Sequence, residues 1–179
     1  MERIQLSKIE PKFCRESLVV KTSRVFPQDT NNHNTLFGGR LMTYIDDAAS
    51  ICASRHCRTD IVTASTDSVD FLNPIKNDHS VCLEAYVSST GRSSMEIFVK
   101  VIAENLKTGE RYLAATSFLT FVALNEEGRS VEVASVIPQS DEEKRIHAGA
   151  EARSLARKER VKQSKALAAS LSTELPWLE

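Results

Sequence analysis

The run DTNNHNTLFGGRLMTYIDDAAS, residues 29–50, gathers amides, glycines and carboxylates that could act on a substrate. Gly38 and Gly39 stand where a helix would begin. A helix N-terminus without side chains offers free backbone N–H groups and the positive end of the helix dipole to an approaching oxygen atom. Asp46 follows eight residues after Gly38, which is roughly 12 Å along a helix. Amides that polarise a carbonyl and a carboxylate that activates water would together form a hydrolytic site.

Two aspartates are adjacent in this run, and the helical pattern favours one of them. Residues three and four positions apart share a helix face. Asp46 lies on a mostly apolar stripe with Met42, Ala49 and, one turn further on, Ala53, whereas the stripe of Asp47 contains Thr43, Ser50 and Ser54. We therefore expect Asp46 to point toward the side of the helix that a sheet covers, and Asp47 to lie on a polar face. A carboxylate on a buried face needs a partner or a purpose, so Asp46 is the candidate base.

A purely structural interpretation of the same run is also open. Gly38 and Gly39 would then form a joint between a loop and a helix, and Asp46 would cap the helix or pair with a polar group of the core. The asparagines would be loop residues that bond their own backbone. Residue types and spacing leave both interpretations in place.

One helix and several strands must position this run. Residues 41–55 contain no proline or glycine, and apolar residues recur through them at helical spacing, which predicts a helix suited to a core. Alternating apolar residues and turn signals predict strands over residues 16–26, 60–74, 81–87, 95–101 and 110–124. A helix that follows one strand and precedes several antiparallel strands indicates an α+β fold, in which one sheet wraps the helix.

The composition changes after Pro138. Ser140 and Glu143 fit a capping box, and residues 141–171 are rich in Ala, Lys, Arg and Glu, which predicts a helical appendage. This appendage is basic, with eight basic residues against two acidic ones over residues 144–165. We therefore divide the chain into a polar leader (1–13), a single domain (14–128) and a linker with a basic helical tail (129–179).

Composition and charge exclude several classes of function. The 179 residues are 41% hydrophobic and carry a net charge of −1, so no overall field would draw the protein to nucleic acid or to an anionic membrane. No apolar run approaches the roughly 18 to 20 residues that span a bilayer, and the first residues contain no apolar signal region, so we expect a cytoplasmic protein. The four cysteines and four histidines lack metal-ligand spacing, which predicts reduced thiols and no metal.

The run at residues 29–50 resembles the D-T-N, F-G-G, M and D signature of the acyl-CoA thioesterase branch of the hotdog superfamily. The resemblance extends through TASTDSVDFLNPIKNDHSVCLEAYVSSTGRSSMEIFVKVIAEN to RYLAATSFLTFVAL, and so covers residues from about 16 to 124. It implies a bacterial-type, single-domain acyl-CoA hydrolase with a long central helix wrapped by an antiparallel sheet. It further implies that two sheets join in a homodimer, often within a trimer of dimers, with active sites at the dimer interface.

The resemblance also implies roles for the residues of this run. The family's catalytic carboxylate falls on Asp46 and its asparagine partner on Asn31, and the two come from different subunits. The amides of Gly38 and Gly39 would polarise the thioester carbonyl. Asp46 would act as general base on water or attack directly to give a mixed anhydride, while Asn31 orients the water or the carbonyl.

Coenzyme A binding is implied along the strand VDFLNP and the turn GRSS. The implied residues are Phe71, Leu72, Pro74, Gly91, Arg92, Ser93 and Ser94. Arg92 and the two serine hydroxyls suit phosphate or pantetheine contacts, although the same turn could be a plain solvated hairpin. The basic tail could reach the nucleotide of coenzyme A, or it could be a solvated face or an oligomer contact. We expect no cofactor beyond the coenzyme A of the substrate.

Two other functions share this scaffold. A hotdog dehydratase would need a histidine in its active site, and only His33 lies near Asp46 in sequence. Many thioesterase relatives carry a histidine where this chain has Phe37, and His33 is four positions too early to replace it. A non-catalytic acyl-CoA-binding regulator would leave Asn31 and Asp46 dispensable. Because the chain retains both, the sequence predicts hydrolysis of acyl-CoA to a free acid and coenzyme A.

Overall fold

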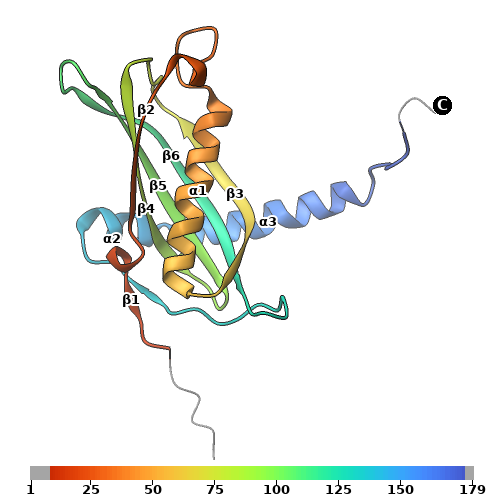
Figure 1. The fold of residues 1–179 in the computed structure, drawn as a ribbon. Helices are drawn as coiled ribbons and strands as arrows, with labels where there is room; N and C mark the ends of the chain where they lie inside the picture. The colour runs from red at the N-terminus through yellow and green to blue at the C-terminus, as the bar shows by residue number, and fades with distance from the viewer. Residues whose placement is uncertain (1–8, 176–179) are drawn as a thin grey trace, which may run out of the picture.

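The computed structural model describes residues 9–175, in which one long helix lies along a curved antiparallel sheet (Figure 1). The helices are α1 (Gly38–Cys57), α2 (Asp141–Ala148) and α3 (Ala150–Ala168), with short 3-10 turns at Cys14–Glu16 and Pro27–Asp29. The strands are β1 (Lys12–Phe13), β2 (Val19–Arg24), β3 (Asp60–Phe71), β4 (His79–Thr90), β5 (Ser94–Asn105), β6 (Arg111–Leu124) and β7 (Val136–Ile137). The predicted α+β fold with a sheet around a central helix is confirmed.

Helix α1 forms because its apolar residues repeat on one face. Leu41 and Ile45 are at most 3% exposed and pack against the sheet. The helix begins at Gly38, three residues before the predicted start, because Phe37 at the N-cap still has extended backbone angles (φ −62°, ψ 130°). It ends where Arg58 takes a left-handed conformation with φ of 58°. The predicted helix is therefore confirmed and is slightly longer at both ends.

The sheet has the strand order β2-β4-β5-β6-β3, and every neighbouring pair is antiparallel. The five predicted strands correspond to β2 through β6. Strand β3 is an edge strand, since among the described residues 9–175 only its β6 side is paired. Its register against β6 shifts between Thr63 and Ser65 and again between Thr66 and Ser68. Such bulges bend a strand, which lets this edge follow the curve of the sheet around α1.

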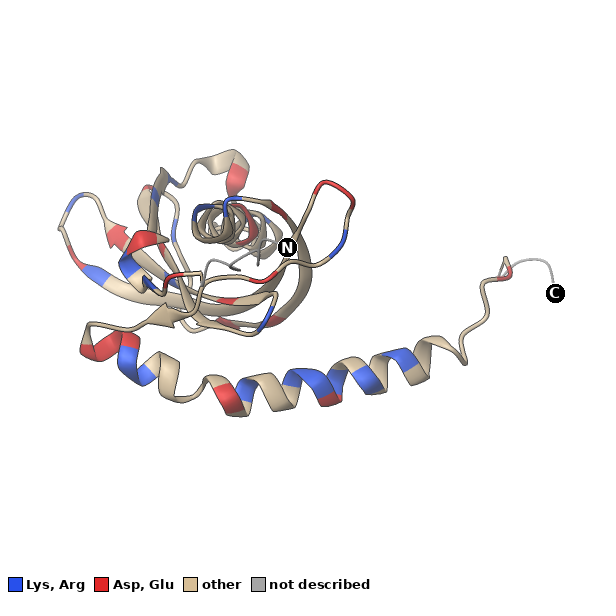
Figure 2. Ribbon diagram, turned by 90° about the horizontal axis from the view of Figure 1, so that it is seen from below, with Lys and Arg blue, Asp and Glu red and all other residues tan. Residues whose placement is uncertain are grey.

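The two faces of the sheet are covered by different elements. The inner face presents fully buried aliphatic side chains such as Leu83 to α1. On the outer face, Tyr86, Phe98 and Phe118 form an aromatic cluster with ring centroids 5.1 to 5.7 Å apart. Helices α2 and α3 run across this outer face (Figures 1 and 2), and the guanidinium carbon of Arg153 on α3 lies 4.2 Å from the centroid of the Phe118 ring.

The basic tail is helical, as predicted, but it consists of two helices. Ser140 caps α2, because its Oγ accepts from the Glu143 N–H at 3.1 Å and the Glu143 carboxylate accepts from the Ser140 N–H at 2.9 Å. The predicted capping box is confirmed. Gly149 separates α2 from α3, and its N–H reaches back only three residues to Ile146 O at 3.3 Å. This break allows α3 to take its own direction across the sheet.

The segment after β6 returns toward the beginning of the described chain. Strands β1 and β7 pair in parallel, with Lys12 opposite Val136 and Phe13 opposite Ile137. Residues 1–8 of the expected polar leader lie outside the described residues. Residues 129–137, expected as a linker, lead directly into this two-stranded pairing.

The cysteines are free thiols, as predicted. Burial, together with the nearby Glu143 carboxylate, raises the pKa of Cys14 to about 12, and burial raises the pKa of Cys52 to about 12. Neither thiol is therefore a nucleophile near neutral pH. Within residues 9–175, no helix is both long enough and apolar enough to span a bilayer.

His56, in the last turn of α1, holds the returning segment. Its side chain is 1% exposed, and its Nε2 donates to Ala134 O at 2.9 Å. Its own carbonyl accepts from Lys12 Nζ at 2.6 Å. Burial lowers the pKa of His56 below its ordinary value of 6.5, with the hydrogen bond to Ala134 O opposing that shift. The folded protein therefore favours the neutral ring.

The substitution His56→Gln should reduce the pH dependence of stability. Because the folded-state pKa lies below 6.5, the neutral ring stabilises the fold above that pH, and this stabilisation is lost as the pH falls from 6.5 through the folded-state pKa. Urea unfolding at about pH 7.5 and about pH 5.5 measures the effect. From the higher to the lower pH, the free energy of unfolding should fall more in the wild type than in the variant. Equal decreases would show that His56 does not cause the pH dependence of stability.

Candidate active site

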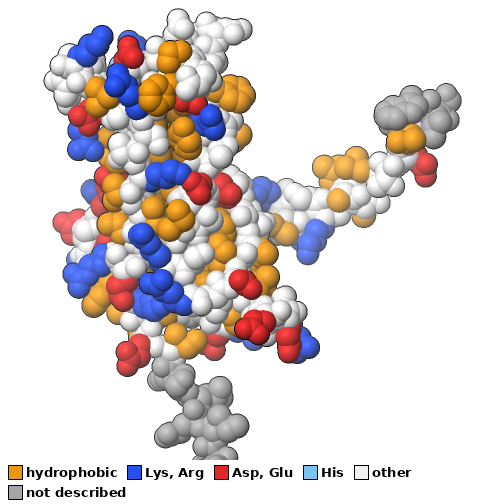
Figure 3. Space-filling model, viewed as in Figure 1, with side chains coloured by type: hydrophobic (Ala, Val, Ile, Leu, Met, Phe, Trp, Pro, Cys, Tyr) orange, Lys and Arg blue, Asp and Glu red, His pale blue; other side chains and the backbone are white. Residues whose placement is uncertain are grey.

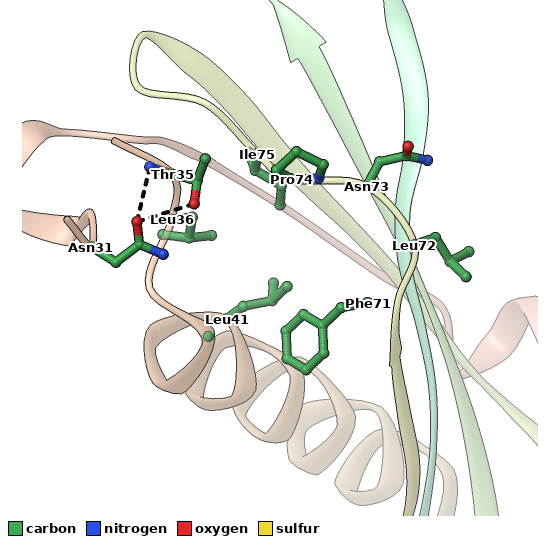
Figure 4. Close-up of a pocket in the computed structure, with 10 residues that line it drawn as sticks. Asn31, Thr35, Leu36, Leu41, Phe71, Leu72, Asn73, Pro74 and Ile75 are labelled. Carbon is green, nitrogen blue, oxygen red and sulfur yellow. Dashed lines mark hydrogen bonds between the residues drawn. The ribbon is translucent and has the colours of Figure 1, made fainter. Parts of the chain in front are cut away.

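The loop between the second 3-10 turn and α1 is organised by Asn31. Its Oδ1 accepts hydrogen bonds from the His33 N–H at 2.8 Å, the Thr35 N–H at 3.3 Å and Thr35 Oγ1 at 3.2 Å. The oxygen of the side chain is thus committed to the loop. The amide nitrogen points toward the cavity beside the start of α1 (Figure 4). Asn31 is therefore placed to donate to a bound group.

Asp29 ties this loop to α1. Its side chain is 7% exposed and accepts from Arg40 Nε at 3.1 Å and from Arg40 Nη2 at 3.0 Å. Its carbonyl accepts from the Phe37 N–H at 2.8 Å. The first residue of the D-T-N motif therefore has a structural role, which the sequence analysis did not assign.

The first turn of α1 is bare, as predicted. Phe37 supplies no side-chain cap, and within residues 9–175 the N–H groups of Gly38 and Gly39 donate to no protein acceptor. A Cβ added at Gly38 would lie 3.6 Å from the Phe71 ring, and one at Gly39 would lie 2.6 Å from the Phe37 ring. The helix therefore directs free amides outward between two aromatic side chains.

A cavity of about 410 Å³ opens beside these amides (Figure 4). The 30s loop, the start of α1 and the end of β3 supply its walls. The lining residues are Asn31, Thr35, Leu36, Gly38, Leu41, Phe71, Leu72, Asn73, Pro74 and Ile75. The cavity thus contains five predicted site residues, namely Asn31, Gly38, Phe71, Leu72 and Pro74, and its walls are mostly apolar with a few amide groups.

Two hydrogen bonds fix the wall that follows β3. Tyr112 Oη donates to Pro74 O at 2.9 Å, and Asn73 Nδ2 donates to Leu113 O at 2.9 Å. Burial and the nearby Glu110 carboxylate raise the pKa of Tyr112, so its hydroxyl stays protonated near neutral pH. The wall is therefore preformed by contacts to β6.

Asp46 is exposed, contrary to the prediction that the sheet covers it. Its helical neighbour Ala49 is fully buried, but Met42 is 49% exposed. The sheet of one chain ends at β3, and Asp46 lies at that rim, where Thr63 Oγ1 on β3 donates to Asp46 Oδ1 at 3.5 Å. Asp46 does not line the cavity. Asp47 lies on the polar, exposed side of α1, as predicted.

The turn Gly91–Ser94 lies at the opposite end of the sheet from the cavity. Ser94 pairs with Val122 near the beginning of β3, whereas Phe71 ends β3 at the cavity. The strand between these ends has 12 residues, or roughly 40 Å at about 3.3 Å per residue. One chain therefore does not bring Gly91, Arg92, Ser93 and Ser94 together with the other predicted coenzyme A residues.

The turn instead faces the C-terminal helix. Gly91 and Ser94 line a second cavity of about 70 Å³ together with Ser154 and Arg157 of α3. The Arg92 carbonyl accepts from the Val133 N–H at 2.9 Å. The backbone of the turn is thus held by the returning segment.

Apolar side chains remain uncovered around α1 and the edge strand. Phe37, Phe71, Met42 and Val62 are 45 to 58% exposed, and Figure 3 shows hydrophobic side chains reaching the surface on this side of the molecule. Within residues 9–175 no group of His, Cys, Asp or Glu is arranged to hold a metal ion. An apolar surface beside an open strand edge suits a second protein chain.

The chain is similar in sequence and in fold to known thioesterases. Residues 33–110 match the model of the Thioesterase superfamily. The chain is 64% identical over 168 residues to the uncharacterized acyl-CoA thioester hydrolase YkhA of Bacillus subtilis (strain 168), across 94% of this chain and 98% of that protein. An acyl-CoA hydrolase from Bacillus cereus has a TM-score of 0.89 at 52% identity, across 91% and 99% of the two chains. An apo-hexameric acyl-CoA thioesterase has a TM-score of 0.83 at 44% identity, across 86% and 98%.

An acyl-CoA hydrolase from Staphylococcus aureus is similar as well. In complex with butyryl coenzyme A, coenzyme A and coenzyme A disulfide, it has a TM-score of 0.86 at 45% identity, across 89% of this chain and 97% of that one. Structures of this protein include three variants in which an asparagine, an aspartate and a threonine are each replaced by alanine. The aspartate follows the asparagine by 15 residues, and the threonine follows the aspartate by 17.

Substitution should distinguish the role of the Asn31 side-chain oxygen, which binds the loop, from that of its amide nitrogen. Asn31→Ala removes an acceptor that serves three donors, so the free energy of unfolding should fall by about 1 kcal/mol. Asn31→Asp keeps an acceptor oxygen and should lose less than half as much. Urea unfolding of both variants measures this difference, and equal losses would contradict the assignment of Oδ1 to the loop.

Proposed function

Since the chain belongs to the thioesterase superfamily, we propose that it hydrolyses acyl-CoA. Water adds to the thioester carbonyl and the carbon–sulfur bond breaks, which releases a carboxylic acid and the thiol of coenzyme A. The 64% identity to an acyl-CoA thioester hydrolase over almost the whole chain supports this reaction. Hydrolysis consumes only water, so the proposal includes no cofactor besides the coenzyme A of the substrate.

The observation that carries this proposal is the bare N-terminus of α1 beside the cavity. The amides of Gly38 and Gly39 are free of protein acceptors, and Gly38 lines the cavity. Negative charge develops on the carbonyl oxygen of a thioester when water adds to it. Two preorganised amides at the positive end of a helix dipole would stabilise that charge.

Asp46 is proposed to activate the water. Asn31, Asp46 and Thr63 have the same residue types and the same spacings of 15 and 17 as the three positions replaced in the Staphylococcus aureus hydrolase. Thr63 Oγ1 donates to Asp46 Oδ1, and so acts as a positioning residue for the carboxylate. Asp46 takes a proton from water, or attacks the carbonyl itself to form a mixed anhydride that water then opens.

The complete site is proposed to use two copies of the chain. Asp46 lies outside the cavity that Asn31 and Gly38 line. The cavity lies at the end of β3, and Asp46 lies beside Thr63 in the middle of that strand. Antiparallel pairing of two β3 strands would join two sheets and bring the cavity end of one copy beside the opposite end of the other. Asn31 of one copy would then orient the water or the carbonyl on which Asp46 of the other copy acts. The apo-hexameric relative supports an oligomer, for which we propose a trimer of dimers.

The same pairing would complete the coenzyme A site. Phe71, Leu72 and Pro74 lie at the cavity end of β3, whereas the turn Gly91–Ser94 lies at the opposite end. In an antiparallel pair of sheets, these two groups meet across the interface. Phe71, Leu72 and Pro74 would contact the pantetheine of coenzyme A, and Arg92, Gly91 and the serines of the other copy would contact its phosphates.

The dehydratase alternative lacks a histidine at this site. His33 is exposed in the loop, and its backbone rather than its ring bonds to Asn31. A regulator that binds acyl-CoA without turnover remains an outcome of the same assay, since it would bind the thioester and release no thiol.

Asp46→Asn should abolish most hydrolysis. Loss of a general base lowers kcat about 10²- to 10⁴-fold, measured as thiol released from short, medium and long acyl-CoA esters. Asp47→Asn is the matched control, because Asp47 is the adjacent carboxylate and pairs instead with Lys21; it should keep near-wild-type kcat. An Asp46→Asn variant as fast as the wild type would refute the assignment of the base.

Thr63→Val and Thr63→Ser test the positioning role. Valine keeps the branched shape without the hydroxyl, so kcat should fall about tenfold with little change in KM. Serine restores a donor to Asp46 and should recover most of that loss. If the two variants lose equal activity, the hydroxyl of Thr63 does not position Asp46.

A further inference from the structure

The C-terminal helices cross the outer face of the sheet in the order of its strands. From His147 onward, four contacts fall on successive strands, from β4 to the β3 edge. The contacts are His147 with β4, Arg153 with β5, Arg157 with β6, and Arg160 with β3. Helix α3 therefore leaves the domain at β3, and Figures 1 and 2 show it continuing into open space beyond that edge.

The direction of α3 is fixed by a buried ion pair. Glu96 is 6% exposed and binds Arg153 through two hydrogen bonds of 2.8 and 2.9 Å. Ser88 Oγ donates to the same carboxylate at 2.7 Å. A two-point contact between a planar guanidinium and a carboxylate restricts orientation as well as distance. The helix is therefore held at β5 in one orientation.

A second anchor lies at the edge strand itself. Asp67, on the bulged part of β3, accepts from both Arg157 and Arg160 as well as from Thr120. Burial alone would raise the pKa of Asp67, but hydrogen bonds from Ser65, Thr120 and Arg160 and the charge of Arg157 hold it below its ordinary value. The carboxylate stays ionised, and α3 is fixed up to the last strand of its own sheet.

The face of α3 that contacts the sheet continues beyond the edge with different chemistry. Arg153, Arg157 and Arg160 recur at spacings of four and three, and the next positions of this pattern in α3 are Ser164 and Leu167. Leu171 follows three residues after the helix ends at Ala168. These leucines are 61 and 63% exposed. The stripe thus changes from arginine, where the chain's own sheet lies beneath it, to leucine, where no described part of the chain does.

A second copy paired through β3 would supply the missing surface. Its sheet would continue the outer face on which α3 already lies. Helix α3 runs eight residues past Arg160, or about 12 Å, which is two to three strand spacings. The end of the helix would therefore cross β3 of the second copy and reach its β6.

The outer face near β3 offers an apolar partner for the leucines. Val62 on β3 pairs with Val122 on β6, and Val122 is on the same face as Thr120, which contacts α3. Val62 is 45% exposed. The charges of the two surfaces are opposite. The end of α3 is basic, and Asp70 on β3 is an exposed carboxylate with no ion pair among residues 9–175.

We propose that residues 161–171 of each copy lie across the outer sheet face of the copy paired through β3, with Leu167 and Leu171 against Val62 and Val122. The arrangement is reciprocal, so each dimer has two such arms. It rests on the β3 pairing proposed above and assigns a partner to the basic tail. The arms hold together the two copies that share each active site.

A charge exchange in the full chain tests the contact. Leu167→Lys and Val62→Glu should each raise the dimer dissociation constant at least about tenfold, because each exposes apolar surface and leaves a charge against it. Together the two substitutions should restore at least half of the loss on a logarithmic scale. Leu106→Lys is the matched control, since Leu106 is 47% exposed in the β5–β6 turn, and it should leave the constant unchanged. Molecular mass is measured over a dilution series.

Three outcomes would overturn the arm contact. The single variants could dissociate no more readily than Leu106→Lys, the double variant could show no recovery, or a hexamer could fall apart into dimers as tight as those of the wild type. Thiol release from acyl-CoA by the undiluted wild type is measured in parallel. Absence of thiol release would refute the proposed function without bearing on the masses, so the two failures are distinguishable.

Discussion

An antiparallel sheet that ends in a twelve-residue edge strand leaves the backbone N–H and C=O groups along one side of that strand without strand partners among residues 9–175. In this protein that strand is β3, the longer of the two edge strands. It carries Thr63 in mid-strand and Phe71 at its end, and it lies beside the exposed carboxylate of Asp46. Completing this edge with a second strand would cover the exposed apolar side chains and bring two half-sites together.

The open edge at β3 also explains why the two ends of the proposed site lie on different parts of α1. The 30s loop and the end of β3 surround the N-terminus of the helix, where Gly38 lines a preformed cavity and the amide of Gly39 follows directly. The middle of the helix lies at the rim, and Asp46 is left facing outward. A site split in this way would be active only when assembled, and α3 is anchored so that it could strengthen that assembly.

The sequence predicted those features that depend on local periodicity. Apolar repeats predicted α1 and strands β2 to β6, and Ser140 with Glu143 predicted the start of α2, because each signal lies within a few residues of chain. The prediction that the sheet covers Asp46 was wrong, because periodicity shows which face of a helix is apolar but not where the sheet that covers it ends. Thr63 was missed, since only the pairing of distant segments brings its hydroxyl to Asp46. The separation of the Gly91 turn from the cavity likewise depends on strand register.

Subunit complementation tests the central claim that each site combines Asn31 of one copy with Asp46 of another. Asn31→Asp and Asp46→Asn chains are prepared separately, mixed in equal amounts under conditions that exchange subunits, and assayed for thiol release. Half of the dimers would be mixed, and each mixed dimer would hold one site without a substitution, so about a quarter of wild-type activity should return. If exchange is verified by mass and activity stays at the level of the single variants, both residues act within one chain and the shared site is refuted.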